Sequence, residues 1–286
     1  MTGERLPLSD YEAIVNLALA EDIGPGDVTT RACIPVEKRA VARLVAKSDH
    51  VLCGIEVAKT IFNKLDPECT FSVGRADGES IPAGETLLVV SGNAAALLMA
   101  ERTALNFLQR LSGTATLARQ FVAATAGTKA RILDTRKTTP GLRILQKYAV
   151  RCGGAFNHRA GLFDGVLIKE NHIRAAGGIA KAIAACRANC HHLIAVEVEV
   201  ATLDELDEAL AAGAMIVLLD NFPPQQAAQA AARVNGRVKL EVSGGVTLEN
   251  VRAYAEAGVD LISIGRLTHS APAADISMLF DREIWG

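Results

Sequence analysis

One pattern dominates the second half of this chain: a short apolar segment ends in a polar residue, a helical stretch follows, and the unit recurs. Segments of this kind predict six strands, at residues 132–136, 166–170, 196–200, 216–220, 238–242 and 261–265. The stretches between them predict helices at 180–187, 203–212, 224–234 and 248–258. Nearly continuous apolar strands that alternate with helices are typical of a parallel sheet covered on both faces. We therefore predict an α/β barrel, with room for fewer than the usual eight strands, and keep an open, doubly wound sheet as the alternative.

The part of the chain before residue 113 has a different rhythm. Short β-rich runs are separated by turn signals and surround one predicted helix at 56–65. The runs lie at 43–47, 70–73 and 86–90. This arrangement favours an α+β domain with a small open sheet.

Capping signals predict where three further helices begin. They are the Ser9/Glu12 capping box for a helix to about residue 21, Asn93 for a helix that Ser112-Gly113 would end, and Thr139-Pro140 for a helix to about residue 151. Arg143, Lys147 and Arg151 recur at intervals of four on the last of these, so they share one face. That stripe is either a solvated helix face or a basic surface that attracts an anionic ligand or partner.

The charge of the chain is distributed unevenly. The whole protein has a formal net charge of −2, but residues 129–174 contain 10 Lys or Arg against 3 Asp or Glu. Such a concentration in a folded segment indicates an anionic ligand. Nucleic acid is disfavoured, because the sequence pI is about 6.3 and only 4% of the residues are aromatic. No apolar run is long enough for a membrane span and no signal peptide is evident at the N-terminus, so we expect a cytoplasmic protein.

The residues that end the predicted strands are the first candidates for chemistry. In a barrel or an open parallel sheet, the ligand site lies where the carboxyl ends of the strands meet. In chain order these ends supply Arg136 with Lys137, Lys169, Glu199, Asp220, Ser243-Gly244-Gly245 and Gly265. The last two are glycine-rich turns between a strand and a predicted helix, a setting that is typical of phosphate binding through backbone N–H groups.

Glu199 and Asp220 end neighbouring predicted strands, and Glu197 shares the face of Glu199. Carboxylates beside a phosphate would repel it unless a divalent cation lay between them, so the pattern predicts Mg²⁺. The alternative is that each acid only accepts a hydrogen bond from a neighbouring N–H.

A second group of cations predicts a pocket for a ligand with more than one carboxylate. His158 and Arg159 follow a glycine turn, and they join Arg136 and Lys169 from the strand ends. Arginine binds a carboxylate through two hydrogen bonds, and lysine and histidine add positive charge. The residues alone therefore predict a site that joins a carboxylated small molecule to a metal-bound phosphate compound.

The cysteines give little indication of function. Positions 33, 53, 69, 152, 186 and 190 contain no CxxC motif, and we expect reduced thiols. The densest group of metal-ligand types is Cys186, Cys190, His191 and His192. It is either a zinc site or, more simply, the end of a helix that leads into a strand.

Taken together, the motifs resemble those of the quinolinate phosphoribosyltransferases, the carboxylating nicotinate-nucleotide pyrophosphorylases. The resemblance extends over nearly the whole chain in order. It rests on Glu21–Thr29, Glu101–Asn106, Asp134–Arg143, Gly153–Arg159, Leu167–His172, Glu197–Glu199, Leu219–Asn221, Glu241–Gly245 and Gly265–Ser270. One small departure is Ala155, where the family commonly has a third glycine.

The resemblance implies a reaction in NAD synthesis: quinolinate and phosphoribosyl pyrophosphate give nicotinate mononucleotide, pyrophosphate and CO2, with Mg²⁺. It implies that quinolinate is held by Arg136, His158, Arg159 and Lys169, with Arg102 from the neighbouring subunit of a homodimer or larger assembly. It implies that the phosphoribosyl donor is held by Lys137, Glu199, Asp220, Ser243, Gly244 and Gly265, with Glu199 and Asp220 as metal ligands. We expect the catalytic groups to be Lys137, Lys169, Glu199 and Asp220.

The resemblance also implies an N-terminal α/β domain and an incomplete α/β barrel. We expect the first at residues 1–112, joined by the C-terminal segment 272–286, and the second at 113–271. Two other functions stay open. One is phosphoribosyl transfer to another pyridine carboxylate, and the other is a metabolite-binding barrel without catalysis.

Overall fold

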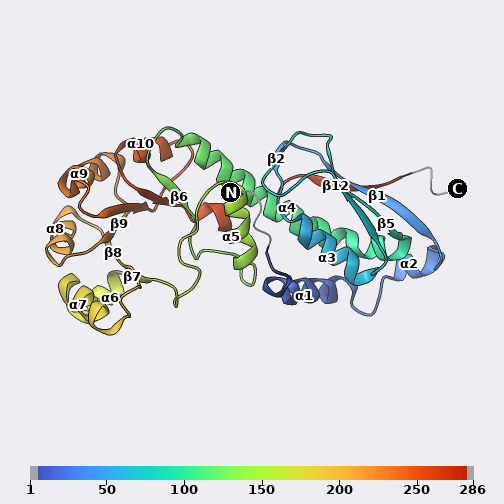
Figure 1. Cartoon of the computed structure of the whole chain (residues 1–286), viewed down its shortest axis with the longest axis horizontal. Helices are drawn as coiled ribbons and strands as arrows, with labels where there is room; N and C mark the ends of the chain where they lie inside the picture. The colour runs from blue at the N-terminus through green and yellow to red at the C-terminus, as the bar shows by residue number, and fades with distance from the viewer. Residues whose placement is uncertain (1–5, 282–286) are drawn as a thin grey trace. The chain divides into compact units, whose positions relative to one another are not determined.

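The computed structural model describes residues 6–281, which form two compact units (Figure 1). Within the described residues, the first unit comprises 6–119, 139–154 and 267–281, and the second comprises 120–138 and 155–266. These bounds differ from the predicted ones at 112 and 271. They differ because helix α4 continues past residue 112, and because the 139–154 segment contributes Leu145 and Ala149 to the core of the first unit.

The first unit is built on a four-stranded antiparallel sheet in the order β12-β1-β5-β3. The strands are β1 (Arg39–Ala46), β3 (Thr70–Val73), β5 (Thr86–Asn93) and β12 (Ile276–Phe280), and β2 (His50–Val51) pairs separately with β4 (Ser80–Ile81). Side chains along β1 alternate between buried and less buried positions, as expected when one face of a sheet covers a core. That core is completed by helices α1 (Glu12–Ile23), α3 (Ile55–Leu65), α4 (Ala94–Ala124) and α5 (Arg143–Cys152), and α2 (Val28–Cys33) follows α1.

The C-terminal segment packs against α4 at a glycine. A Cβ atom built on Gly113 would lie 1.8 Å from the carbonyl oxygen of Pro272. Two hydrogen bonds of Gln109, one turn earlier on α4, reinforce the close approach: Ala274 N donates to Gln109 O at 2.9 Å, and Gln109 Nε2 donates to Ile276 O at 2.8 Å. The segment continues directly into β12, which pairs with β1. A residue without a side chain at position 113 therefore allows the C-terminal segment to lie this close to the helix.

The second unit contains a six-stranded parallel sheet in the order β7-β8-β9-β10-β11-β6. Its strands are β6 (Arg131–Leu133), β7 (Val166–Ile168), β8 (Val196–Val200), β9 (Ile216–Asp220), β10 (Lys239–Ser243) and β11 (Leu261–Ser263). From β7 to β11 each strand pairs with the next in the chain, and β6, the first, pairs with β11, the last. A doubly wound sheet would reverse its direction at a switch point, so this order is that of a barrel left open between β6 and β7.

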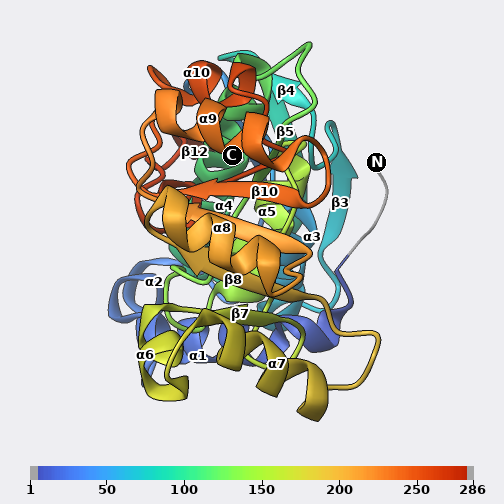
Figure 2. The same cartoon turned by 90° about the vertical axis from the view of Figure 1, so that its left-hand side faces the viewer.

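Helices lie outside this sheet, and Figure 2 shows α7, α8, α9 and α10 in front of the strands. The helices of the unit are α6 (Glu170–Ala176), α7 (Ile179–Asn189), α8 (Leu203–Ala211), α9 (Pro224–Val234) and α10 (Val251–Glu256). A further short helix, α11 (Arg266–His269), follows β11. Leu206, Ala227 and Ala230 on α8 and α9 are buried. The outer helices therefore bury small and branched apolar side chains.

The open edge of β6 is extended by the chain that follows α5. Phe156 N donates to Ile132 O at 2.9 Å, and Asp134 N donates to Phe156 O at 3.1 Å. This short parallel pairing holds the residues after Phe156 beside the carboxyl end of β6. It therefore brings Asn157, His158 and Arg159 to the edge of the sheet where a ligand site was predicted.

Three helix ends that were predicted from capping or stop signals were wrong, and α10 begins at Val251 rather than at the predicted residue 248. Ser9 lies in a 3₁₀ turn, η1 (Leu8–Asp10), and α1 begins at Glu12 with Tyr11 as its N-cap, so the capping box does not form. Helix α4 continues through Ser112 and Gly113 to Ala124. Gly113 does not end the helix, and its missing side chain instead makes room for Pro272.

Helix α5 begins at Arg143 and not at Pro140, because Gly141 has a φ of +78°. A right-handed helix cannot include that conformation. By contrast, Asn93 Oδ1 accepts a hydrogen bond from Ala96 N at 3.1 Å, which confirms the predicted cap of α4.

Within residues 6–281, no helix combines the length and the apolar character that crossing a membrane requires.

Candidate active site

A cavity of about 340 Å³ lies at the carboxyl ends of the strands in the second unit. Its walls combine cations, carboxylates, hydroxyls and a few apolar side chains. The lining residues are Thr135, Arg136, Lys137, His158, Arg159, Leu167, Lys169, Glu199, Leu218, Asp220, Glu241, Ser243 and Ser263. Eight of the predicted site residues are therefore brought together: Arg136, Lys137, His158, Arg159, Lys169, Glu199, Asp220 and Ser243.

The cations reach this cavity from three different segments. Arg136 and Lys137 follow β6, Arg159 lies on the segment that pairs with β6, and Lys169 is the N-cap of α6. Burial lowers the pKa of Arg159, and the positive charge of Arg136 lowers it further. Like charges held this close together favour an anion, because a bound anion relieves their repulsion.

The main chain holds the side chain of Arg159 in place. Its guanidinium donates to the carbonyl oxygen of Gly165 at 2.9 Å. Asp134, which is fully buried, accepts from His158 N at 2.8 Å and from Asn157 Nδ2 at 2.6 Å. The 157–159 segment is therefore fixed by a buried carboxylate rather than by the ligand. Pre-organisation of this kind lowers the entropy cost of binding.

Glu199 and Asp220 form the acidic wall of the cavity. Lys169 Nζ lies 2.7 Å from Glu199 Oε2, and Asn221 Nδ2 donates to Asp220 Oδ2 at 2.9 Å. The pKa of Asp220 is raised, first by burial and then by the negative charge of Glu199, while Lys169 and Lys137 oppose the rise. The two carboxylates therefore lie close enough to repel each other. This chemistry fits Mg²⁺, which binds one or two carboxylates and completes its shell with water and phosphate oxygens.

The glycine turns are only partly brought into the cavity. Ser243 lines it, whereas Gly244 and Gly265 are not among the described residues of its wall. Gly244 has a φ of +93°, and a Cβ there would lie 2.1 Å from Asn221 Oδ1. The absence of a side chain at Gly244 therefore allows the close approach of Asn221, whose main-chain N–H donates to Ser243 O at 2.9 Å.

Two sets of predicted residues lie outside this cavity. Arg102 is exposed on α4, in the first unit. The Arg143, Lys147 and Arg151 stripe lies on α5, also in the first unit, and is not uniformly solvated, because Lys147 is only 6% exposed.

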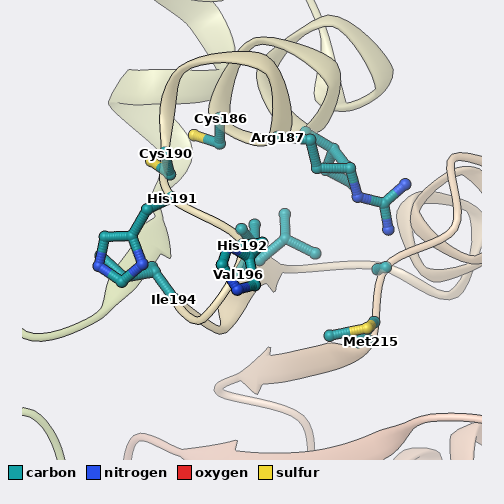
Figure 3. Close-up of a pocket in the computed structure, with 11 residues that line it drawn as sticks. Cys186, Arg187, Cys190, His191, His192, Ile194, Val196 and Met215 are labelled. Atoms are coloured by element: carbon teal, nitrogen blue, oxygen red, sulfur yellow. The ribbon is translucent and has the colours of Figure 1, made fainter.

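The cysteine and histidine group at the end of α7 surrounds a separate cavity of about 170 Å³ (Figure 3). Cys186 and Cys190 lie at the C-terminal end of the helix, and His191 and His192 follow on the loop. Within residues 6–281, the groups whose ligand atoms all lie within 4.8 Å of one another are Cys53, Asp77 and Cys152, and His158, Glu197 and Glu241. The Cys186–His192 group is not among them, so the simpler prediction of a helix end that leads into β8 is favoured over zinc.

Five lining residues were not predicted: Thr135, Leu167, Leu218, Glu241 and Ser263. Glu241 is the most informative of them, because it is 1% exposed and its carboxyl pKa is raised to about 8 by burial and by Glu197. The alternation of β10 could have indicated it, since Glu241 lies two residues before Ser243 and therefore on the same face. Leu218 pairs in register with both Glu199 and Glu241, so these residues form one layer of the sheet.

Comparisons with known proteins match this geometry. Residues 27–112 match the sequence model of the quinolinate phosphoribosyl transferase N-terminal domain, and residues 114–279 match that of the C-terminal domain. A probable nicotinate-nucleotide pyrophosphorylase [carboxylating] from Bacillus subtilis is 44% identical over 265 residues, which cover 93% of this chain and 91% of the relative. One from Synechocystis is 45% identical over 91% of this chain and 89% of the relative. The solved nicotinate-nucleotide pyrophosphorylase from Francisella tularensis superposes with a TM-score of 0.92 at 44% identity, over 97% of this chain and 98% of that one.

Proposed function

Because the chain belongs to the quinolinate phosphoribosyltransferase family, we propose that it transfers the phosphoribosyl group of phosphoribosyl pyrophosphate to quinolinate. The products are nicotinate mononucleotide, pyrophosphate and CO2, which makes the protein an enzyme of NAD synthesis. The observation that supports this most strongly is the composition of one cavity. It combines Arg136, Arg159 and Lys169 with the carboxylates Glu199 and Asp220.

We assign quinolinate to the cationic side of the cavity. The guanidinium groups of Arg136 and Arg159 suit the two adjacent carboxylates of the ligand, because each can donate two parallel hydrogen bonds. Lys169 adds a point charge and already lies 2.7 Å from Glu199. His158 lines the same wall. The cationic groups exceed what a single carboxylate needs, which favours quinolinate over nicotinate.

We assign the phosphoribosyl donor to the side formed by Lys137, Glu199, Asp220 and Ser243, with Gly244 and Gly265 in the turns behind it. Glu199 and Asp220 would hold Mg²⁺, which would supply charge neutralisation for the pyrophosphate. Lys137 neutralises the leaving group from the protein side, and it needs no proton transfer to do so.

The catalytic contribution of these residues follows from where charge develops. When pyrophosphate leaves, positive charge appears on the ribose carbon, and the carboxylate of Glu199 stabilises it. The pyridine nitrogen is already a nucleophile, so the arginines need only orient the ring towards that carbon. Once alkylated, the ring nitrogen is cationic and stabilises the electron pair that stays on the neighbouring ring carbon when the 2-carboxylate departs as CO2. That carbon then takes a proton from water, which completes nicotinate mononucleotide. No covalent intermediate with a lysine is needed.

Three finer points belong to the same proposal. Arg102 completes the quinolinate pocket from the second subunit of a homodimer, since it is exposed on a helix of the first unit. Magnesium is the metal. The location is the cytoplasm, which is supported by the six free cysteines.

A binding comparison between quinolinate and nicotinate tests the assignment of the cationic wall. We expect calorimetry to show that nicotinate, which lacks the second carboxylate, binds at least about 50-fold more weakly than quinolinate. Equal affinity for the two acids would favour the alternative of transfer to another pyridine carboxylate. Tight quinolinate binding without any turnover would favour the non-catalytic metabolite-binding barrel.

A further inference from the structure

The imidazole of His158 has a defined protonation state, which can be deduced from its neighbours. Arg159 N donates a hydrogen bond to His158 Nδ1 at 2.8 Å. A nitrogen that accepts a hydrogen bond has its lone pair free and has no proton, so the proton of the neutral ring is on Nε2. Nε2 lies 3.2 Å from Glu197 Oε2 and 3.5 Å from Glu241 Oε1. His158 therefore presents an N–H group to two carboxylates.

The position of the proton on His158 also disfavours a metal ion in this cluster. The ligand atoms of His158, Glu197 and Glu241 all lie within 4.8 Å of one another, which alone would allow one. However, a metal needs the lone pair of Nε2, and the one lone pair of a neutral imidazole is already used at Nδ1. The cluster is therefore suited to holding protons.

The carboxylates of Glu197 and Glu241 are buried more deeply than the imidazole of His158. Glu197 is 7% exposed and Glu241 is 1% exposed. Among the residues that the structure describes, Glu197 Oε1 is buried without a hydrogen-bond partner, and buried Glu241 Oε1 has the ionic contact with His158 Nε2 at 3.5 Å but no hydrogen bond. Two ionised carboxylates in this setting would repel each other, and burial together with Glu197 raises the pKa of Glu241 to about 8. One proton on Glu241, directed at Glu197, would satisfy both oxygens.

We propose that Glu197 and Glu241 are positioning residues for quinolinate. They hold the His158 ring in the orientation in which its Nδ1 accepts a hydrogen bond from the main-chain N–H of Arg159. That hydrogen bond fixes the main chain from which the Arg159 guanidinium extends. Asp134 holds the other side of the same segment through His158 N and Asn157 Nδ2. The inference rests on the proposed function only where it concerns quinolinate, because the support of His158 by the two glutamates is independent of the ligand.

Three variants test this role by steady-state kinetics. Glu241→Ala removes one support of the ring, and we expect KM for quinolinate to rise roughly tenfold while KM for phosphoribosyl pyrophosphate stays within about twofold. Glu241→Gln keeps the size and a hydrogen-bond donor towards Glu197, so it should restore KM to within about twofold of the wild-type value. Val242→Ala is the matched control, since Val242 is the next residue of β10 and is fully buried. A similar rise in KM for Val242→Ala, or no rescue by Gln, would overturn the proposal.

A second measurement needs no turnover. The ¹⁵N resonances of the His158 ring, assigned by comparison with His158→Gln, should show the neutral Nε2–H form at pH 7 in the wild type and a mixture of forms in Glu241→Ala. A charged or Nδ1-protonated ring in the wild type would contradict the inference. If the ring has the expected form but quinolinate is not turned over, the proposed function fails and the support of His158 by the glutamates stands.

Discussion

Gly113→Ala is expected to destabilise the protein by about 2–4 kcal/mol, although alanine is the better helix former. The added Cβ would lie 1.8 Å from Pro272 O and 2.9 Å from Pro272 C. Both are backbone atoms, so no side-chain rotation can relieve the clash. The C-terminal segment would have to move away from α4, which would strain its hydrogen bonds to Gln109 and the pairing of β12 with β1. Thermal unfolding followed by circular dichroism should show Tm lowered by roughly 5–10 °C.

Gly165→Ala is the matched control for this substitution. Gly165 has no positive φ, and its built Cβ would lie 3.5 Å from the Arg159 Cβ, which is an ordinary contact. Its Tm should therefore stay close to that of the wild type. If Gly113→Ala is as stable as Gly165→Ala, the close approach of Pro272 to α4 is not a feature of the folded protein.

Mixing two inactive variants is expected to restore activity if Arg102 acts across a homodimer. Arg102→Ala and Lys169→Ala should each lose nearly all activity, because each removes a cation from the proposed quinolinate pocket. In a mixed dimer one site keeps its own Lys169 and receives Arg102 from the partner, while the other site loses both. After unfolding and refolding of an equal mixture, about a quarter of the wild-type activity should return, since half of the dimers are mixed and each has one intact site.

Lys169→Ala mixed with Glu199→Ala is the control for subunit exchange. Both residues line the same cavity of one chain, so each site in a mixed dimer keeps one defect. This mixture should stay inactive. Recovery there, or no recovery in the Arg102 mixture despite mixed dimers shown by native mass spectrometry, would count against a shared site.

The second unit was predicted well because its signals are local. Each strand is a short apolar segment with a helical stretch after it, and parallel strands bring their carboxyl ends to one edge whatever the details. The bounds of all six strands were therefore predicted to within three residues, and Arg136, Lys169, Glu199 and Asp220 do meet at that edge. The order of the strands was not predictable in this way, and it is the pairing of β6 with β11 that distinguishes the barrel from an open sheet.

The helix ends were predicted wrongly where the role of a residue depends on a contact with a distant part of the chain or on an unusual backbone conformation. Gly113 was interpreted as a helix end, but it is required by Pro272, which is 159 positions later. Thr139-Pro140 has the composition of a helix start, but Gly141 adopts a positive φ and delays the helix to Arg143. Neither the contact of Gly113 with Pro272 nor the positive φ of Gly141 can be predicted from the neighbouring residues alone.

Glu241 shows the same limit within the site. A glutamate inside an apolar strand carries no local signal that indicates its partner. The partner is His158, which is 83 positions earlier and reaches it through the pairing of Phe156 with β6. The residues at the strand ends were therefore predictable, whereas the contact of Glu241 with His158 depends on a pairing between distant segments.

The most direct test of the account is a product analysis of the purified wild-type protein incubated with quinolinate, phosphoribosyl pyrophosphate and Mg²⁺. We predict nicotinate mononucleotide, with one pyrophosphate and one CO2 released for each molecule formed, and no product when the phosphoribosyl donor is omitted. A folded protein that binds quinolinate but forms no nicotinate mononucleotide under these conditions would contradict the proposed function.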